Sequence, residues 1–70
     1  MHMKRGIYRH YKGKRYEVIA TAKHTETHEL YVVYRPLEGK KQLWVRPKTM
    51  FQEYVVHEGK RVRRFTLWQS

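Results

Sequence analysis

The chain has 70 residues and no cysteine, and 16 Lys and Arg against 6 acidic residues give a formal net charge of +10. This length allows one small domain, because domains usually contain about 50 to 250 residues. The lack of cysteine excludes disulfide frameworks, thiolate metal sites and cysteine nucleophiles. The longest apolar run, Leu30-Tyr31-Val32-Val33-Tyr34, is far shorter than a membrane helix, and no secretory signal is visible. We therefore expect a soluble, cytoplasmic module without membrane contact.

Strand-favouring residues dominate the chain, with seven Val, two Ile, five Thr and ten aromatics against two Ala. Met1-His2-Met3 is interpreted as a cloning remnant that leads into the native start, and residues 4–68 as one domain. Turn signals recur, and Gly in three of them supplies the positive φ of a tight turn. These turns are Tyr11-Lys12-Gly13-Lys14, His24-Thr25-Glu26-Thr27, Leu37-Glu38-Gly39-Lys40 and His57-Glu58-Gly59-Lys60. The strands predicted between them cover residues 6–10, 15–24, 29–36, 42–46, 54–57 and 61–67.

The second predicted strand alternates between its two faces, with Tyr16, Val18, Ala20 and Ala22 on one of them. Ile19 interrupts the polar face, which indicates a bent strand that is partly covered on both sides. Long strands bend in this way when a small sheet curls on itself.

The segment from Arg46 to Phe51 lacks the alternation of a strand. Because Pro47 suits a first helical position, we predict one helical turn over residues 47–52 that places Met50 and Phe51 in the mouth of a barrel. The expected fold is all-β, a small SH3-like barrel of five or six short antiparallel strands. An open meander packed as a dimer is the alternative.

The positive charge belongs to the two ends of the chain. Residues 1–16 have a net charge of +6, residues 17–59 a net charge of zero, and residues 60–70 a net charge of +4. If the ends meet in the fold, they create one basic face that attracts polyanions. If they do not, the charge serves solubility.

Several ordered motifs resemble those of a bacterial family, the domain of unknown function 1653. The motifs are Gly6-Ile7-Tyr8-Arg9-His10-Tyr11-Lys12-Gly13, Tyr16-Glu17-Val18, Ala22-Lys23-His24-Thr25-Glu26-Thr27, Val32-Val33-Tyr34-Arg35, Leu43-Trp44-Val45-Arg46-Pro47, Met50-Phe51 and Arg64-Phe65. The resemblance covers the chain from about Lys4 to Phe65. It implies a compact, β-rich bacterial module and no particular activity.

Basic and aromatic residues alternate in Tyr8-Arg9-His10-Tyr11, a pattern that suits single-stranded nucleic acids. The leading hypothesis is a non-enzymatic module that binds RNA or DNA, with Tyr11 and Trp44 as stacking surfaces. The alternative for Tyr8 and Tyr11 is packing in the core. The predicted phosphate contacts are Arg9, Lys12, Lys14, Arg15, Arg61, Arg63 and Arg64.

A second hypothesis is a ligand pocket formed by His10, His24, Glu26, Trp44 and Arg46. His24 and Glu26 could hold a small molecule or a metal, but their spacing is not that of a helical zinc motif. The alternative is a hairpin turn in which Glu26 and Thr27 accept backbone N–H groups.

Trp44 and Pro47 could border a groove for an acidic protein partner, by analogy with other SH3-like barrels. Arg46 in this groove would bind an anion, or it would pair with Glu26.

The sequence offers little for catalysis. Asp is absent, and Ser70, at the end of the chain, is the sole serine. A Ser-His-acid triad is therefore disfavoured. A threonine nucleophile at Thr25 or Thr27, beside His24, is chemically conceivable. A carboxylate pair of Glu26 and Glu29 lacks any sign of a sugar-binding cleft. We expect no enzyme activity, no cofactor and no bound metal.

Overall fold

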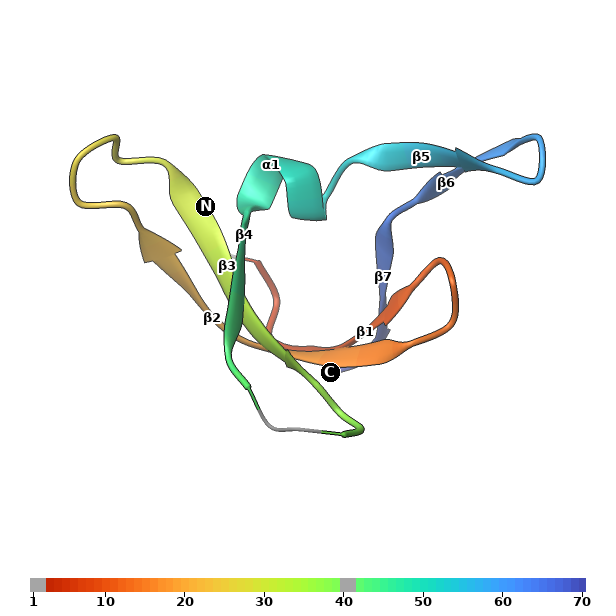
Figure 1. Cartoon of the computed structure of the whole chain (residues 1–70), viewed down its shortest axis with the longest axis horizontal. Coiled ribbons are helices and arrows are strands. Elements are labelled where there is room, and N and C mark those ends of the chain that lie inside the picture. The colour runs from red at the N-terminus through yellow and green to blue at the C-terminus, as the bar shows by residue number, and fades with distance from the viewer. Residues whose placement is uncertain (1–2, 40–41) are drawn as a thin grey trace.

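The computed structural model describes residues 3–39 and 42–70. Met1 and His2, interpreted as a cloning remnant, and Lys40 of one predicted turn lie outside the described residues. The strands are β1 (Gly6–His10), β2 (Arg15–Lys23), β3 (Leu30–Pro36), β4 (Trp44–Pro47), β5 (Tyr54–His57), β6 (Lys60–Arg63) and β7 (Phe65–Gln69), and the helix α1 (Lys48–Phe51) follows β4 (Figure 1).

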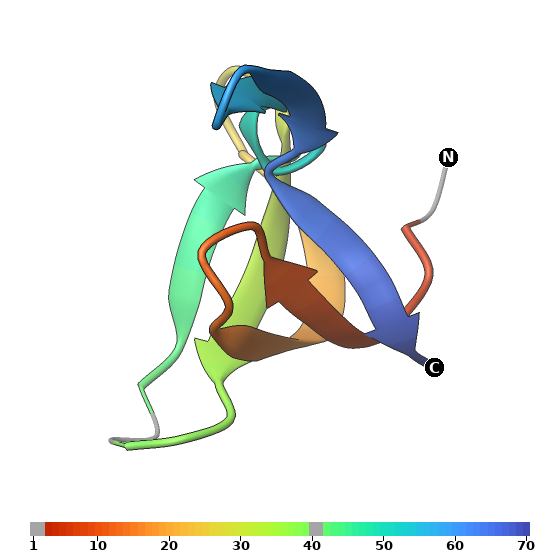
Figure 2. The ribbon, with the colours of Figure 1, turned by 90° about the vertical axis from the view of Figure 1, so that its right-hand side faces the viewer.

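The strands form two antiparallel sheets. The larger sheet has the order β4-β3-β2-β1-β7, and β5 and β6 form a separate hairpin. The large sheet curls around the core, but its edge strands β4 and β7 are not paired with each other (Figure 2). The prediction of an all-β, barrel-like domain with one helical turn is therefore confirmed, and the barrel is open.

The long strand β2 bends where the sequence indicates. Val18 is paired with Tyr34, whereas Ala20 is paired with Val33, so the register of β2 against β3 shifts at Ile19. An extra residue of this kind increases the local twist of a strand. The bend allows β2 to pair with β3 along most of its length while the sheet curls toward β1.

The predicted helical turn exists, but it begins one residue later. Pro47 has the extended angles φ −52° and ψ 137° and ends β4, and the helix starts at Lys48. Phe51 is buried with 1% of its surface exposed, as expected, but Met50 is 45% exposed. The prediction for Met50 is wrong because consecutive residues of a helix point about 100° apart, so only one of two neighbours can face the core.

The predicted last strand, 61–67, is two strands that meet at Arg64. The backbone N–H of Arg64 donates to the carbonyl of Glu53 (3.0 Å), beside the β5–β6 hairpin, and its carbonyl accepts from the N–H of Tyr11 (3.0 Å), beside β1. The chain thus leaves one sheet and enters the other at this residue. Arg64 is a corner, and the corner positions the hairpin over the end of β1.

Aromatic rings make up most of the core. Phe51 and Phe65 lie parallel with their ring centroids 4.0 Å apart. Tyr8 and Tyr34 meet Phe51 edge to face at 5.5 and 5.4 Å, a favoured geometry for aromatic pairs. The buried hydrophobic residues are Met3, Tyr8, Val18, Val32, Tyr34, Phe51 and Phe65. The interpretation of Tyr8 as a core residue is therefore confirmed, and burial raises the pKa of its hydroxyl.

Candidate nucleic-acid interface

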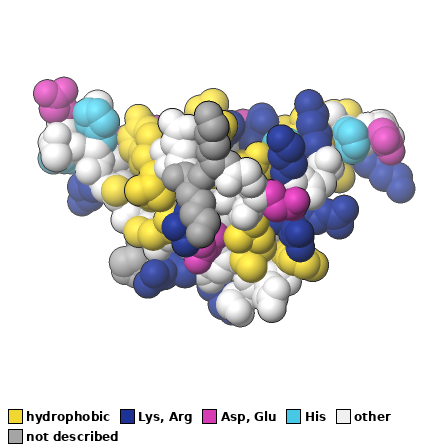
Figure 3. Space-filling view, turned by 60° about the horizontal axis from the view of Figure 1, so that its bottom comes forward, with side chains coloured by type: hydrophobic (Ala, Val, Ile, Leu, Met, Phe, Trp, Pro, Cys, Tyr) yellow, Lys and Arg dark blue, Asp and Glu magenta, His cyan; other side chains and the backbone are white. Residues whose placement is uncertain are grey.

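The two basic ends of the chain meet in the fold. β1 pairs with β7 in an antiparallel register in which His10 lies opposite Phe65 and Arg9 lies opposite Thr66. The β1–β2 turn and the β5–β6 hairpin project from the same side of the molecule, one below the other (Figure 1). Lys and Arg side chains are densest at this end in the space-filling view (Figure 3). The expected approach of the two charged ends is confirmed.

A cleft of about 440 Å³ lies between the β1–β2 turn, the β5–β6 hairpin and β7. Its walls combine two guanidinium groups with aromatic and imidazole rings. The lining residues are Arg9, His10, Tyr11, His57, Val62, Arg63, Thr66, Leu67 and Trp68. Single-stranded nucleic acids are bound by cations, which hold their phosphates, and by rings, which stack on their bases. The cleft contains both.

Five of the seven predicted phosphate contacts remain available. Arg9 and Arg63 line the cleft. Lys12 and Lys14 are exposed on the β1–β2 turn, and Arg61 is exposed on β6. Among the described residues, none of these five forms an ion pair with a carboxylate.

Arg61 and Arg63 are held in place by one aromatic ring. Their guanidinium carbons lie 4.2 and 4.9 Å from the centroid of Tyr54, on the neighbouring strand β5. Arg63 also donates to the carbonyl of Gln52 (3.4 Å). A guanidinium group stacked on a ring loses less conformational freedom when it binds an anion, so Tyr54 pre-arranges both cations.

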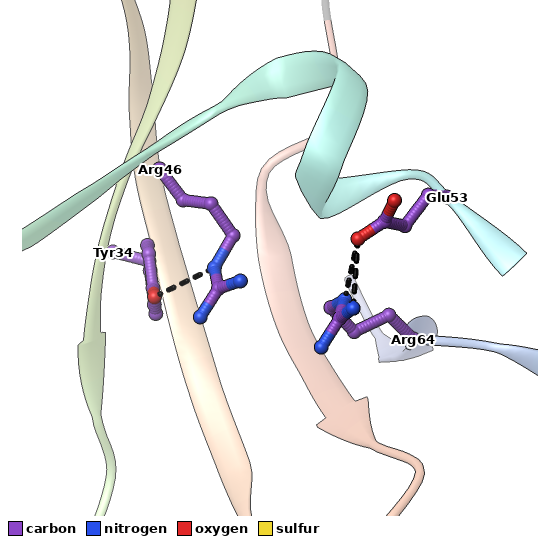
Figure 4. Close-up of polar contacts among 4 residues, drawn as sticks. All are labelled: Tyr34, Arg46, Glu53 and Arg64. Atoms are coloured by element: carbon purple, nitrogen blue, oxygen red, sulfur yellow. Dashed lines mark hydrogen bonds and ion pairs between the residues drawn. The ribbon is translucent and has the colours of Figure 1, made fainter. Parts of the chain in front are cut away.

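The other two predicted contacts, Arg15 and Arg64, are compensated by glutamates from the centre of the chain. Arg15 pairs with Glu38 at 3.3 Å and lies over the ring of Trp68, whose centroid is 5.1 Å from the guanidinium carbon. Arg64 donates two hydrogen bonds to one carboxylate oxygen of Glu53, at 2.7 and 3.0 Å (Figure 4). These pairs reduce the positive charge that the sequence predicts for this face.

The two predicted stacking surfaces are separated in the fold. Tyr11 lines the cleft, where it stacks on His10 with ring centroids 4.5 Å apart and lies 5.1 Å from His57. Trp44 is 47% exposed, but it lies on the edge strand β4 and is not among the residues that line the cleft.

Sequence reasoning missed Trp68 and His57 as cleft residues. Trp68 is 53% exposed and lies on β7, one residue beyond the end of the predicted strand 61–67. The alternation of faces along a strand could have identified Trp68. Residues two apart share a face, so Thr66 and Trp68 lie on the face opposite that of the buried Phe65. His57 is the first residue of the predicted turn that closes the β5–β6 hairpin, and only the corner at Arg64 brings it to the cleft.

The predicted pocket residues do not converge on one place. His24 and Glu26 lie in the β2–β3 turn, at the opposite end of the molecule from His10 at the end of β1 (Figure 1). His24 lines a small hollow with Ala22, Lys23, Tyr31 and Val45, and Glu26 does not. Within residues 3–39 and 42–70, no group of three His, Asp or Glu side chains is placed to hold a metal ion.

Hydrogen bonds assign His24 to the structure of its turn. Its Nδ1 accepts the backbone N–H groups of Glu26 (3.2 Å) and Thr27 (3.3 Å). The hydroxyl of Thr27 accepts the N–H of Glu29 (3.2 Å), as predicted. The prediction that Glu26 accepts such a bond is wrong, because the imidazole occupies that role and Glu26 is the donor.

His10 and Arg46 are close to one ring of the core. The His10 ring lies 5.0 Å from the ring of Phe65, and the Arg46 guanidinium carbon lies 5.9 Å from the same centroid. Arg46 donates to the hydroxyl of Tyr34 (3.4 Å), and it does not pair with Glu26. Of the predicted pocket, the structure therefore brings these two residues together.

The environment of His10 opposes its protonation. Burial lowers the pKa of His10, and the positive charges of Arg64, Lys12 and Arg46 lower it further. In the unfolded chain the pKa returns to its ordinary value of 6.5. At pH values between the lowered pKa of the folded state and 6.5, the unfolded state binds more protons than the folded state. The folding stability contributed by His10 is therefore present above pH 6.5 and is lost as the pH falls through the lowered pKa.

We expect the free energy of unfolding to fall between pH 7.5 and pH 5.5, and to fall less in a His10→Gln variant, because glutamine does not titrate. Urea unfolding of both proteins at both pH values measures the difference. The comparison subtracts the contributions of the other histidines, which both proteins share. An equal loss of stability in the two proteins would contradict the role of His10.

Within the described residues, no helix has the length and apolar character needed to cross a membrane. A comparison with curated proteins finds no match. Among solved structures, the chain is similar to a crystal structure of a protein belonging to DUF1653 from Bordetella bronchiseptica, with 30% sequence identity and a TM-score of 0.86 over 96% of this chain and 88% of that chain. A family model described as "Protein of unknown function (DUF1653)" matches residues 6–67. The resemblance seen in the sequence motifs is thereby confirmed, and the chain belongs to the DUF1653 family.

Proposed function

We propose that this chain is a non-enzymatic module that binds single-stranded RNA or DNA in the cleft between the β1–β2 turn, the β5–β6 hairpin and β7. The observation that carries the proposal is the composition of this cleft, where Arg9 and Arg63 lie among the rings of Tyr11, His57 and Trp68. The guanidinium groups would hold phosphates, and the rings would stack with bases. The module is proposed to act in the bacterial cytoplasm without a cofactor.

A single strand fits this cleft better than a duplex does. The faces of duplex bases are covered by their neighbours, so the rings of Tyr11 and Trp68 in the cleft could not stack on them. In a single strand the bases are accessible, and each base stacked on a protein ring contributes about 1–3 kcal/mol. The ring contacts therefore favour unpaired nucleic acid, while the cations act on both forms.

The test is a titration of a fluorescent single strand of about 12 nucleotides at several salt concentrations. Of the seven predicted phosphate contacts, the five without a carboxylate partner among the described residues are Arg9, Lys12, Lys14, Arg61 and Arg63. If each contacts one phosphate, the logarithm of the association constant falls with the logarithm of salt concentration with a slope of about −3.5.

A duplex of the same length is the control and should bind more weakly. No detectable binding at low salt, or an affinity that does not depend on salt, would rule out the proposed function. The other predictions, an acidic protein partner and a small-molecule or metal site at His24 and Glu26, would then be tested by a pull-down from nuclease-treated lysate and by thermal shifts with metals and nucleotides.

A further inference from the structure

Three hydrogen-bond donors from three parts of the fold approach one another beside the cleft. Arg46 comes from β4, Arg64 from the corner between β6 and β7, and His10 from the end of β1. The Phe65 ring is their common floor: the His10 ring and the Arg46 guanidinium carbon lie 5.0 and 5.9 Å from its centroid, and Arg64 is its neighbour in the chain. Phe51 stacks on Phe65 at 4.0 Å and supports this floor from the core.

Arg46 lacks a negative partner. Its side chain is half-buried, and its Nε donates to the neutral hydroxyl of Tyr34 at 3.4 Å. Among the described residues it forms no ion pair, and its terminal amino groups donate no hydrogen bond. A partly buried charge without a counter-charge is costly, and an anion bound from solution would remove this cost.

Arg64 is held in place by Glu53. Its Nε and Nη2 both donate to one oxygen of Glu53, so the remaining amino group, Nη1, keeps its donors. Figure 4 shows Arg46 beside Tyr34 and Arg64 beside Glu53, and both guanidinium groups lie close enough to His10 to act on it electrostatically. Two guanidinium groups with one carboxylate leave a net positive charge between them.

His10 supplies the third donor. Its Nδ1 accepts the backbone N–H of Lys12 at 3.1 Å, so the neutral ring carries its proton on Nε2. Burial, followed by the positive charges of Arg64, Lys12 and Arg46, lowers the pKa of His10 and keeps the ring neutral, and a bound anion would offset the effect of these charges. Among the described groups at this site, the one carboxylate is that of Glu53, which forms an ion pair with Arg64.

We infer that Arg46, Arg64 and His10 form a binding site for a phosphate monoester. The three donors come from three separate parts of the fold, which suits the oxygens of a tetrahedral phosphate, whereas a carboxylate presents two oxygens in one plane. The phosphate could belong to the end of a nucleic-acid strand in the adjoining cleft, which His10 also lines, or to a free small molecule. The first source rests on the proposed function, and the second does not.

The first experiment uses uridine 5′-monophosphate as the probe, with uridine and acetate as controls. Nuclear magnetic resonance follows the Nε–H signals of Arg46 and Arg64 during the titration. Uridine 5′-monophosphate should shift both signals, and neither control should do so at the same concentration. An Arg46→Gln variant should bind the nucleotide about tenfold more weakly or worse, since it removes the unpaired guanidinium group.

The matched control is Arg5→Gln, which makes the same change at an exposed arginine beyond the other end of β1. It should leave the affinity unchanged. If Arg46→Gln does not fold, Arg46→Lys replaces it. Lysine keeps the charge but loses the planar fork of donors, so it should also weaken binding. Equal shifts with acetate, or no shifts with the nucleotide, would overturn the inference.

The second experiment identifies the source of the phosphate. A strand with a terminal phosphate is compared with the same strand ending in a hydroxyl. Tighter binding of the phosphorylated strand, lost in Arg46→Gln, assigns the site to strand ends. Nucleotide binding without this preference assigns it to free phosphate monoesters. If single strands bind, but neither uridine 5′-monophosphate nor the phosphorylated strand binds better than its control, the phosphate site is wrong and the proposed function stands. If uridine 5′-monophosphate binds and single strands do not, the phosphate site stands and the proposed function is wrong.

Discussion

Replacing Phe51 by alanine is expected to leave much of the protein unfolded at 25 °C. Phe51 is 1% exposed and contacts the rings of Tyr8, Tyr34 and Phe65. Removing a buried phenylalanine side chain costs about 3–5 kcal/mol. A core in a domain of this size supplies only about 3–5 kcal/mol in total. Circular dichroism and urea unfolding measure the loss.

Met50→Ala is the matched control, because Met50 is the neighbour of Phe51 in α1 and is 45% exposed. This substitution should change the free energy of unfolding by less than about 1 kcal/mol. If Phe51→Ala unfolds cooperatively with the same midpoint urea concentration as the unchanged protein, the assignment of Phe51 to the centre of the core is wrong.

Replacing both Arg9 and Arg63 by glutamine is expected to weaken the binding of a single strand at least tenfold at low salt. Both side chains line the cleft, and both are among the five predicted phosphate contacts that form no described ion pair with a carboxylate. Because each lost phosphate contact reduces the salt dependence, the slope should become shallower by about 1.4. Fluorescence anisotropy at several salt concentrations measures both quantities.

Lys23→Gln serves as the control for charge. Lys23 is an exposed cation at the end of β2, next to the β2–β3 turn and far from the cleft (Figure 1). If binding depends on the net charge of the whole molecule, this variant should lose half as much affinity, on a logarithmic scale, as the double variant. If binding depends on the cleft, it should lose almost none. The first result would remove the cleft from the proposed function.

Local patterns predicted most of the strands. The first three strands, Gly6–His10, Arg15–Lys23 and Leu30–Pro36, match the predicted ranges within one residue. β-branched and aromatic residues between Gly-containing turns are a local signal, and the turns close between neighbouring strands. Gly13 and Gly59 have the positive φ values, 109° and 76°, that their turns require. No distant contact is needed for such features.

The end of the chain shows where local patterns fail. Val62 and Phe65 read as one continuous strand, but the backbone of Arg64 bonds to Glu53 on one side and to Tyr11 on the other. These partners are far away in the sequence, so no short window contains the information that the strand divides there. The same corner decides that His57 and Trp68 reach the cleft.

Local features of the sequence are enough to predict a small all-β module with charged ends, because strand propensity and turns depend on neighbouring residues and charge depends on composition. The tertiary structure decided which of these charges remain available. Arg15 and Arg64 are paired with Glu38 and Glu53, while Arg46 is left with the neutral hydroxyl of Tyr34. Ion pairs form between side chains that the fold brings within about 4 Å, and that distance is set by strand pairing across the whole chain rather than by position along it.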